Sequence, residues 1–201
     1  MPTLTTKFYE TRTDTELCKI ALHGHIEEAF GVIYDRYRDR IYGLACSYAE
    51  DRDDAEDVTQ QVFIRAHRSL HQFRGGSQLF TWLYRIAINC CKDWVQQAYH
   101  ARKDRCDDYW WSKQATGDDL FSKPTRTESR LEQREADDFL QKALARLTPE
   151  FRSALVLREL DGMSYREIGR ALGCSEGTVK SRICRARHQL KKQLVVLGYT
   201  P

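Results

Sequence analysis

The chain has 201 residues, of which 41% are hydrophobic and 30% are charged. This balance is too charged for an integral membrane protein and too apolar for a disordered chain, and the length suits one large domain or two small ones. The net charge of +3 is close to neutral and, taken alone, would argue against a nucleic-acid partner.

The charge is distributed unevenly along the chain. Residues 14–99 carry 10 Lys and Arg against 13 Asp and Glu, whereas residues 139–201 carry 12 against 5. Such asymmetry predicts nucleic acid or another polyanion at the basic end and a different partner at the acidic end.

Seven cysteines occur without a CxxC pair, and the N-terminus lacks the apolar stretch of a secretory signal peptide. The longest aliphatic run, residues 194–197, is too short to cross a bilayer. We therefore expect reduced thiols and a cytoplasmic protein.

Helical periodicity appears almost everywhere in the chain, and no alternating strand pattern competes with it, so we expect an all-α fold. A short helix is predicted from an N-cap at Asp14 to about Gly24, and a later one from Asp53, with Glu56 completing a capping box. Between them, steps of three and four residues predict a helix whose apolar stripe comprises Phe30, Ile33, Tyr34, Tyr37, Ile41, Leu44, Ala45 and Tyr48.

The helix predicted for residues 78–97 has two distinct faces. One face is apolar, and the other combines an aromatic ring, amides and cations: Gln78, Trp82, Arg85, Asn89 and Lys92. Unpaired bases are bound by stacking on aromatic rings and by hydrogen bonds to their edges, so this face and the preceding loop at 69–77 are a candidate single-strand platform. A stripe of this kind is more often part of a core.

The periodicity fails over residues 101–135, which we interpret as an interdomain linker. It divides the chain into two small helical domains, at 14–100 and 136–195. The aromatic residues Tyr109, Trp110 and Trp111 in the linker are expected to be buried against another surface.

Turn and cap residues divide the C-terminal domain into short helices. Thr148 and Pro149 predict an N-cap and first helical position, and Ser164 with Glu167 predicts a capping box. Gly173 ends that helix and Ser175 caps the last one, which gives a helix-turn-helix pattern.

The last helix is strongly cationic, and in such motifs its N-terminal half enters the major groove. Its free N–H groups suit a phosphate, and its arginines can bond guanine. A solvated basic helix is the simpler alternative. The residues expected to contact duplex DNA are Ser175, Gly177, Thr178, Lys180, Ser181, Arg182, Cys184 and Arg185.

Six acids lie within residues 50–57, where they complement a helix dipole. Because they would also repel nucleic acid, this surface is expected to meet a basic protein.

Five motifs, in order on both sides of the linker, resemble those of the ECF (extracytoplasmic-function, group IV) sigma factors of the sigma-70 family. They are DAEDVTQQVF at 54–63, FRGGS at 73–77, TWLYRIAIN at 81–89, LRELDGMSY at 157–165 and GTVKSR at 177–182. The resemblance covers about residues 14–194, and the combination is far more specific than any one motif.

The resemblance implies a promoter-specificity subunit of bacterial RNA polymerase, with catalysis left to the polymerase. Such a subunit is expected to have a sigma-2 domain and a sigma-4 helix-turn-helix domain, and to need no cofactor or metal. The residues that match the family's docking positions for the β′ coiled coil of the polymerase are Asp54, Asp57, Gln60, Gln61 and Phe63. The resemblance implies that the basic helix recognises the minus thirty-five element. The residues implied in recognising and melting the minus ten element are Ser69, Phe73, Arg74, Trp82, Arg85, Asn89 and Lys92.

The partners that the resemblance implies are the polymerase core, including its β flap, and promoter DNA in duplex and single-stranded form. An anti-sigma factor is a further implied partner, and it could hold the chain at the membrane. No small-molecule substrate is expected. Three positions depart from the common family pattern: Gln61 replaces Glu, Gly169 replaces Ala and Thr148 replaces Leu.

Two alternatives stay open at this point. A stand-alone helix-turn-helix regulator would bind duplex DNA as a dimer without a single-strand platform. A zinc enzyme would use His67 and His71, which are four residues apart, but the intervening Arg68 would repel a cation.

Overall fold

The computed structural model describes residues 8–49, 51–73, 77–106 and 139–199, and every regular element in these ranges is helical. The side chains of residues 99–106 are not described. The all-α expectation is therefore confirmed for the described part of the chain. None of its helices is long and apolar enough to span a membrane.

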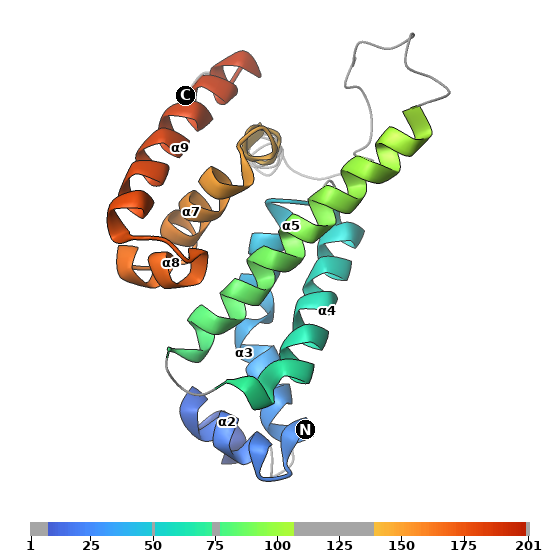
Figure 1. The fold of residues 1–201 in the computed structure, drawn as a ribbon, viewed down its shortest axis with the longest axis vertical. Coiled ribbons are helices and arrows are strands. Elements are labelled where there is room, and N and C mark those ends of the chain that lie inside the picture. The colour runs from blue at the N-terminus through green and yellow to red at the C-terminus, as the bar shows by residue number, and fades with distance from the viewer. Residues whose placement is uncertain (1–7, 50, 74–76, 107–138, 200–201) are drawn as a thin grey trace, which may run out of the picture.

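The described residues of the first unit, 8–106, contain a helical turn at 8–10, four longer α-helices and one short 3-10 helix. The elements after that turn are α2 (Asp14–Leu22), α3 (Ile26–Cys46), α4 (Arg52–Ser69), η1 (Leu70–Gln72) and α5 (Leu79–Cys106). Consecutive helices pack on one another around a core of α3, α4 and α5 side chains (Figure 1). The core side chains with almost no exposure include Ile33, Ile41, Leu44, Val62, Leu83 and Tyr84.

The helix starts differ from the sequence expectations by one or two residues. Thr13 is the N-cap of α2, and it forms a reciprocal capping box with Glu16. Asp51 is the N-cap of α4, where its carboxylate accepts from the Asp54 N–H at 2.8 Å. The predicted caps at Asp14 and Asp53 were therefore wrong, because several adjacent residues in both segments have capping side chains.

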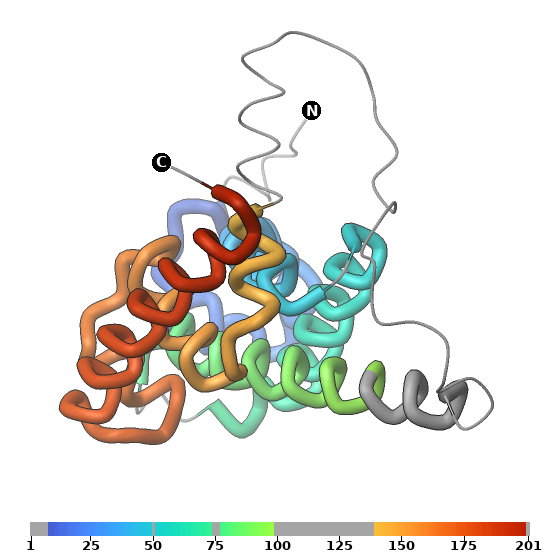
Figure 2. The backbone as a smooth tube through the Cα atoms, turned by 90° about the horizontal axis from the view of Figure 1, so that it is seen from above, coloured from blue at the N-terminus to red at the C-terminus, as the bar shows by residue number. Residues whose placement is uncertain are grey.

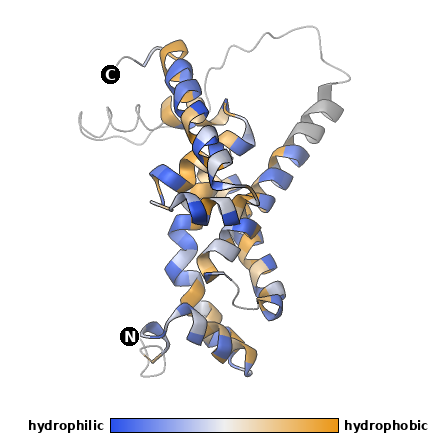
Figure 3. Cartoon of the chain, turned by 60° about the vertical axis from the view of Figure 1, so that its left-hand side comes forward, coloured by the Kyte–Doolittle hydropathy of each residue, from blue (hydrophilic) through white to orange (hydrophobic). Residues whose placement is uncertain are grey.

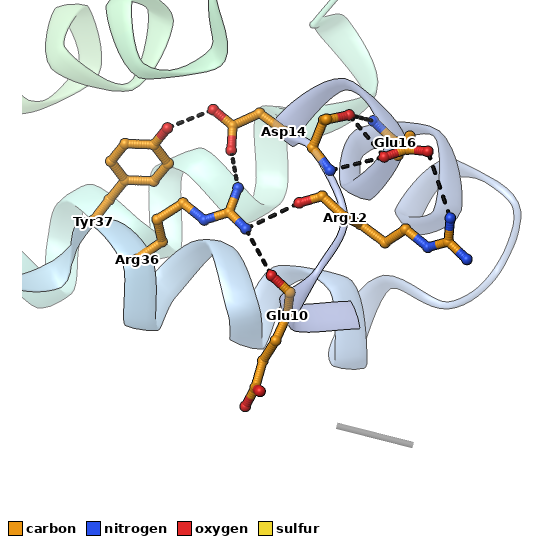
Figure 4. Close-up of polar contacts among 7 residues, drawn as sticks. Glu10, Arg12, Asp14, Glu16, Arg36 and Tyr37 are labelled. Atoms are coloured by element: carbon orange, nitrogen blue, oxygen red, sulfur yellow. Dashed lines mark hydrogen bonds and ion pairs between the residues drawn. The ribbon is translucent and has the colours of Figure 1, made fainter. Parts of the chain in front are cut away.

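Asp14 instead fixes the N-terminal segment to α3 (Figure 4). Its carboxylate accepts hydrogen bonds from Arg36 and Tyr37. The Arg36 guanidinium also donates to the carbonyls of Glu10 and Arg12, at 3.4 and 3.0 Å. Burial, followed by the bond to Asp14, raises the pKa of Tyr37, so this hydroxyl stays protonated at neutral pH.

The helix α5 extends beyond the predicted end at residue 97 and continues to Cys106. The first six residues of the predicted linker, 101–106, are thus helical. The rest of that linker, including Trp110 and Trp111, lies outside the described residues.

The second unit, residues 139–199, contains a helical segment at 139–145 followed by α7 (Pro149–Glu159), α8 (Tyr165–Leu172) and α9 (Glu176–Val196). The predicted capping box of Ser164 and Glu167 and the cap at Ser175 are confirmed. Gly173 has φ +66°, the left-handed conformation that ends α8 at low cost for glycine. Figure 3 shows both hydrophilic and hydrophobic residues on these helices, as amphipathic helices require.

The two units lie against one another (Figures 1 and 2). Helix α8 contacts α5, and α7 contacts α3. Buried side chains of both units form one continuous apolar cluster.

Candidate nucleic-acid interface

The predicted platform on α5 is partly exposed. Leu83, Ala87 and Cys91 are buried and hold the helix against the core, while Arg85 and Asn89 on another side are exposed. Trp82 and Lys92 are half-buried. A surface that carries an indole ring, an amide and two cations has the groups needed to stack on a base and bond its edge.

Two aromatic rings from separate elements meet at this surface. Phe73 follows η1, and its ring centroid lies 5.4 Å from that of Trp82 with an angle of 52° between the ring planes. The structure therefore brings together two residues that the sequence placed nine positions apart, and both remain partly accessible. Arg74, predicted beside them, lies outside the described residues.

Ser69 is directed toward its own helix. Its hydroxyl donates to the Arg65 carbonyl at 2.6 Å, a local bond that is common for serine near a helix end. A base contact through the Ser69 proton would require this bond to break.

Arg85 makes a contact that the sequence did not predict. Its guanidinium donates to the backbone carbonyl of Arg170, in the last turn of α8. Arg85, which was predicted to contact DNA from the first unit, therefore forms a hydrogen bond with the second unit.

The basic face of α9 is exposed as predicted. Val179, Ile183 and Ala186 are buried on the inner side of the helix. The residues that lie exposed on the other side are Lys180, Ser181, Cys184 and Arg185.

The hydroxyls at the start of α9 are bonded to the helix itself. Ser175 accepts from the Thr178 N–H at 3.2 Å, and the two hydroxyl oxygens lie 2.9 Å apart. Arg182 is half-buried, with Nη1 3.7 Å from the Cys174 sulfur, so it braces the turn between α8 and α9 instead of extending outward. Gly177 is exposed at the same end.

The turn is packed closely. A Cβ added at Gly169 would lie 2.7 Å from the carbonyl oxygen of Cys174, closer than real Cβ contacts allow. Glycine in α8 therefore allows the backbone of the turn to approach the helix.

The acidic surface of α4 is also accessible. Asp57, Gln60 and Gln61 are exposed, and Asp54 is half-buried. Burial raises the pKa of Asp54, and the neighbouring Asp51, Asp57 and Asp53 carboxylates add to the effect.

Phe63, the last of the residues predicted to dock on the polymerase, is packed in the core. It is buried, and its ring packs edge-on against Phe30 and Tyr34 of α3 at centroid distances of 6.3 and 4.6 Å. The ring therefore holds α4 on α3, and polymerase docking through Phe63 stays a prediction.

Two clefts flank the exposed ridge of α4. The cleft toward α3 has a volume of about 320 Å³ and is lined by Tyr34, Arg38, Tyr42, Glu56, Asp57, Thr59 and Gln60. The cleft toward α5 has a volume of about 480 Å³ and is lined by Asp57, Val58, Gln60, Gln61, Arg65, Cys90, Asp93, Trp94 and Gln97. Asp57 and Gln60 line both, so they form the ridge between two concave surfaces.

The histidines considered for zinc have other surroundings. The ring of His67 packs edge-on against Phe30 at 5.0 Å, and His71 is exposed. Within the described ranges, no group of three His, Cys, Asp or Glu side chains is arranged to hold a metal ion.

Comparison with protein families finds two matches in chain order. Residues 33–101 match sigma-70 region 2, and residues 140–190 match sigma-70 region 4. The first match contains α4 and the α5 platform, and the second contains α8 and α9 as far as residue 190.

This chain is similar to curated proteins over most of their length. The chain is 34% identical to the RNA polymerase sigma-H factor of Pseudomonas aeruginosa over 84% of this chain and 87% of that protein. It is 34% identical to the ECF RNA polymerase sigma-E factor of Escherichia coli K12, over 92% and 96%.

Two solved structures share the fold. CnrH, solved in complex with the cytosolic domain of CnrY, is 26% identical with a TM-score of 0.64, over 91% of this chain and 97% of that one. The sigma factor RpoE of Bartonella quintana, solved with the anti-sigma factor NepR, is 26% identical with a TM-score of 0.56, over 83% and 97%.

Proposed function

The chain belongs to the ECF sigma factors of the sigma-70 family and is an RNA polymerase sigma factor, and from this we propose which of its surfaces binds each partner. The first unit is the sigma-2 domain and the second is the sigma-4 domain. The alternative of a stand-alone helix-turn-helix regulator is not favoured, because such a regulator would not need a sigma-70 region 2 domain.

The docking surface for the polymerase core is the ridge of α4, with Asp54, Asp57, Gln60 and Gln61. Its carboxylates attract a basic helix of the β′ subunit, and the clefts on both sides of the ridge offer room for side chains of that partner. The buried Phe63 supports the ridge from below.

The minus ten surface is the Phe73–Trp82 ring pair with Asn89 and Lys92. The rings stack on a base released from the duplex, the Asn89 amide bonds its edge, and Lys92 neutralises phosphate. The minus thirty-five surface is the exposed face of α9 containing Lys180, Ser181, Cys184 and Arg185, which has the shape and charge to enter the major groove.

The observation that carries this proposal is that acidic, aromatic and basic surfaces lie on three different helices, α4, α5 and α9. A protein that must bind another protein, melted DNA and duplex DNA at once needs three such surfaces. We further propose that an anti-sigma factor restrains the chain in the cytoplasm, as the partners of the solved relatives suggest.

In vitro transcription tests the proposal. Purified core polymerase is mixed with fragments of the host's genomic DNA, with or without the chain, and the transcripts are sequenced. We expect transcripts that depend on the chain and share sequence elements upstream of their start sites. No such transcripts, together with a palindromic footprint of the chain alone, would contradict the proposal.

A further inference from the structure

Gly177 has no need to be glycine for the fold of this chain. It is the second residue of α9, and it is helical, without the positive φ that Gly173 has at the end of α8. A Cβ added to Gly177 would meet only the Ser175 Oγ, at 3.9 Å, an ordinary van der Waals contact. Alanine would therefore fit, and it would lose less conformational freedom on folding than glycine does.

The helix-turn-helix motif also contains a glycine of the opposite kind. At Gly169 in α8, a Cβ would lie 2.7 Å from the Cys174 carbonyl oxygen, so the fold itself excludes a side chain there. Gly31 and Gly43 in α3 resemble Gly177, because each has open space around the added Cβ. What separates Gly177 from these two is the surface on which it lies.

Gly177 lies on the exposed face of α9 that carries the minus thirty-five surface. Residues three, four and seven positions apart share one side of a helix, so Gly177 is aligned with Lys180, Ser181 and Cys184. All four are exposed, and the buried side of α9 lies elsewhere on the helix. The N-terminal half of a recognition helix enters the major groove, so Gly177 lies in the part of this face that meets the base edges.

The dimensions of helix and groove leave little space between them. An α-helix with its side chains is about 10–12 Å across, and the major groove of B-DNA is about 12 Å wide. The side chains on the leading side of the helix therefore determine how closely its backbone approaches the bases. Ser181 and Cys184 are short, and Gly177 has no side chain. The long cations Lys180 and Arg185 lie on the two flanks of these three residues.

We propose that Gly177 allows the backbone of α9 to lie in van der Waals contact with promoter DNA, and that it thereby sets the depth at which the helix enters the major groove. Proteins use glycine where a backbone must approach a ligand closely. This inference rests on the proposed function, because it requires the exposed face of α9 to be the minus thirty-five surface. It assigns a role in sequence specificity to a residue that has no side chain to contact a base.

The depth of insertion matters more for base contacts than for phosphate contacts. Hydrogen bonds to base edges need donor–acceptor distances of about 2.7–3.2 Å, so a helix held further out loses them. The attraction of cations to phosphates supplies most non-specific binding and decreases more gradually with distance. A side chain at residue 177 should therefore weaken binding to the minus thirty-five sequence while leaving binding to unrelated duplex DNA nearly unchanged.

Binding by the polymerase holoenzyme, formed from core polymerase and the full chain, tests the proposal. The probes are a fluorescent promoter fragment identified by the transcription experiment and the same fragment with its minus thirty-five element scrambled. We expect Gly177→Ala to lower affinity for the promoter fragment about tenfold and to leave affinity for the scrambled fragment unchanged. Gly177→Leu, with a larger side chain, should lower the promoter affinity further.

Gly31→Ala is the matched control. Gly31 is also an exposed helical glycine with open space around it, on a helix that has no part in the minus thirty-five surface. Its replacement should change neither affinity. Chemical denaturation of both alanine variants establishes that they are folded, and we expect each to be at least as stable as wild type. Weaker binding by a variant that is no less stable cannot result from unfolding.

Wild-type promoter affinity of the Gly177→Ala holoenzyme would overturn the inference. An equal loss of affinity for both fragments would also overturn it, because base contacts would then not be what the side chain disturbs. The same holds for an equal loss caused by Gly31→Ala. A wild-type holoenzyme that binds both fragments equally would instead refute the minus thirty-five role of α9, so failure of the inference and failure of the proposed function give different results.

Discussion

Gly169 and Cys174 are in contact through their backbones, on the two sides of the helix-turn-helix corner. The Cys174 N–H donates to the Gly169 carbonyl at 2.9 Å, and the Cys174 carbonyl occupies the space where a Cβ on residue 169 would lie. This contact gives a structural reason for Gly169, which departs from the alanine common in the family.

Gly169→Ala should therefore destabilise the chain. Helix propensity favours alanine by up to about 1 kcal/mol, but an approach of 2.7 Å to a backbone oxygen requires the turn to move. Chemical denaturation is the measurement, and Gly31→Ala is the matched control. Gly31 is exposed within α3 with open space around it, so its replacement should stabilise by about 0.5–1 kcal/mol. Equal stabilisation by both variants would show that the turn adjusts freely.

Asn89→Ala should impair promoter melting while leaving assembly with the core polymerase intact. The amide is exposed on α5, about two turns after Trp82 and on the same side of the helix, and loss of a base-edge contact should slow open-complex formation about tenfold. Permanganate footprinting of unpaired thymines measures the effect. Gln96→Ala, an exposed amide further along α5, is the control. An unchanged footprint for the Asn89 variant would argue against the base-binding role.

Arg185→Ala should weaken binding of the minus thirty-five duplex by about 1–3 kcal/mol, because its side chain lies on the exposed face of α9. The salt dependence distinguishes two roles. A phosphate contact would lower the log–log slope by about 0.9, whereas a base contact would relax specificity at one position. Lys142→Ala, an exposed cation outside α9, should change neither. An equal effect of both substitutions would indicate only a general electrostatic contribution.

Two substitutions in α4, Phe63→Ala and Asp57→Asn, should distinguish its part in folding stability from its part in binding the core polymerase. Loss of the buried ring should cost about 3–5 kcal/mol of folding free energy. Asp57→Asn should leave the stability nearly unchanged and weaken binding to core polymerase, because the carboxylate is exposed on the ridge. Denaturation and a core-binding titration measure the two effects. Normal core affinity for Asp57→Asn would remove this residue from the docking surface.

The capping box of α8 should make stability depend on pH in the acid range. Bonds from the side chain and then the backbone of Ser164 hold the pKa of Glu167 below its ordinary value. A carboxylate with a lowered folded-state pKa stabilises the fold above its unfolded pKa, near 4.3, and loses this contribution as pH falls through the folded value.

Glu167→Gln should therefore reduce stability at pH 7 and have a progressively smaller effect below about pH 4. Ser164→Ala removes the other half of the box and should cost about 1 kcal/mol at neutral pH. Denaturation curves at several pH values measure both, with the exposed Glu56→Gln as control. A pH-independent effect of Glu167→Gln would show that its charge plays no part.

The sequence predicted the helices and the exposed faces of α5 and α9 well, because periodicity and caps are local properties. It misplaced the caps at Asp14 and Asp53, since neighbouring residues have equivalent capping chemistry. It did not show that Phe63 packs in the core, because family position does not distinguish a surface residue from the core residue that supports it.

The contacts between the units could not be predicted in this way. Arg40 and Asp161 are separated by 121 positions, and neither has an unusual local pattern. The same is true of Tyr48 and Ser153, which would be interpreted from sequence as an ordinary stripe residue and an ordinary helix residue.

The length of the segment after α5 bears on what holds the two units together. The 32 residues from 107 to 138 join the end of α5 to the second unit, and a chain of that length could reach about 110 Å if fully extended. The covalent connection therefore does not by itself fix how far apart the units lie. Their arrangement in this structure depends on the contacts of α5 with α8 and of α3 with α7, so substitutions in those contacts are the ones that would change it.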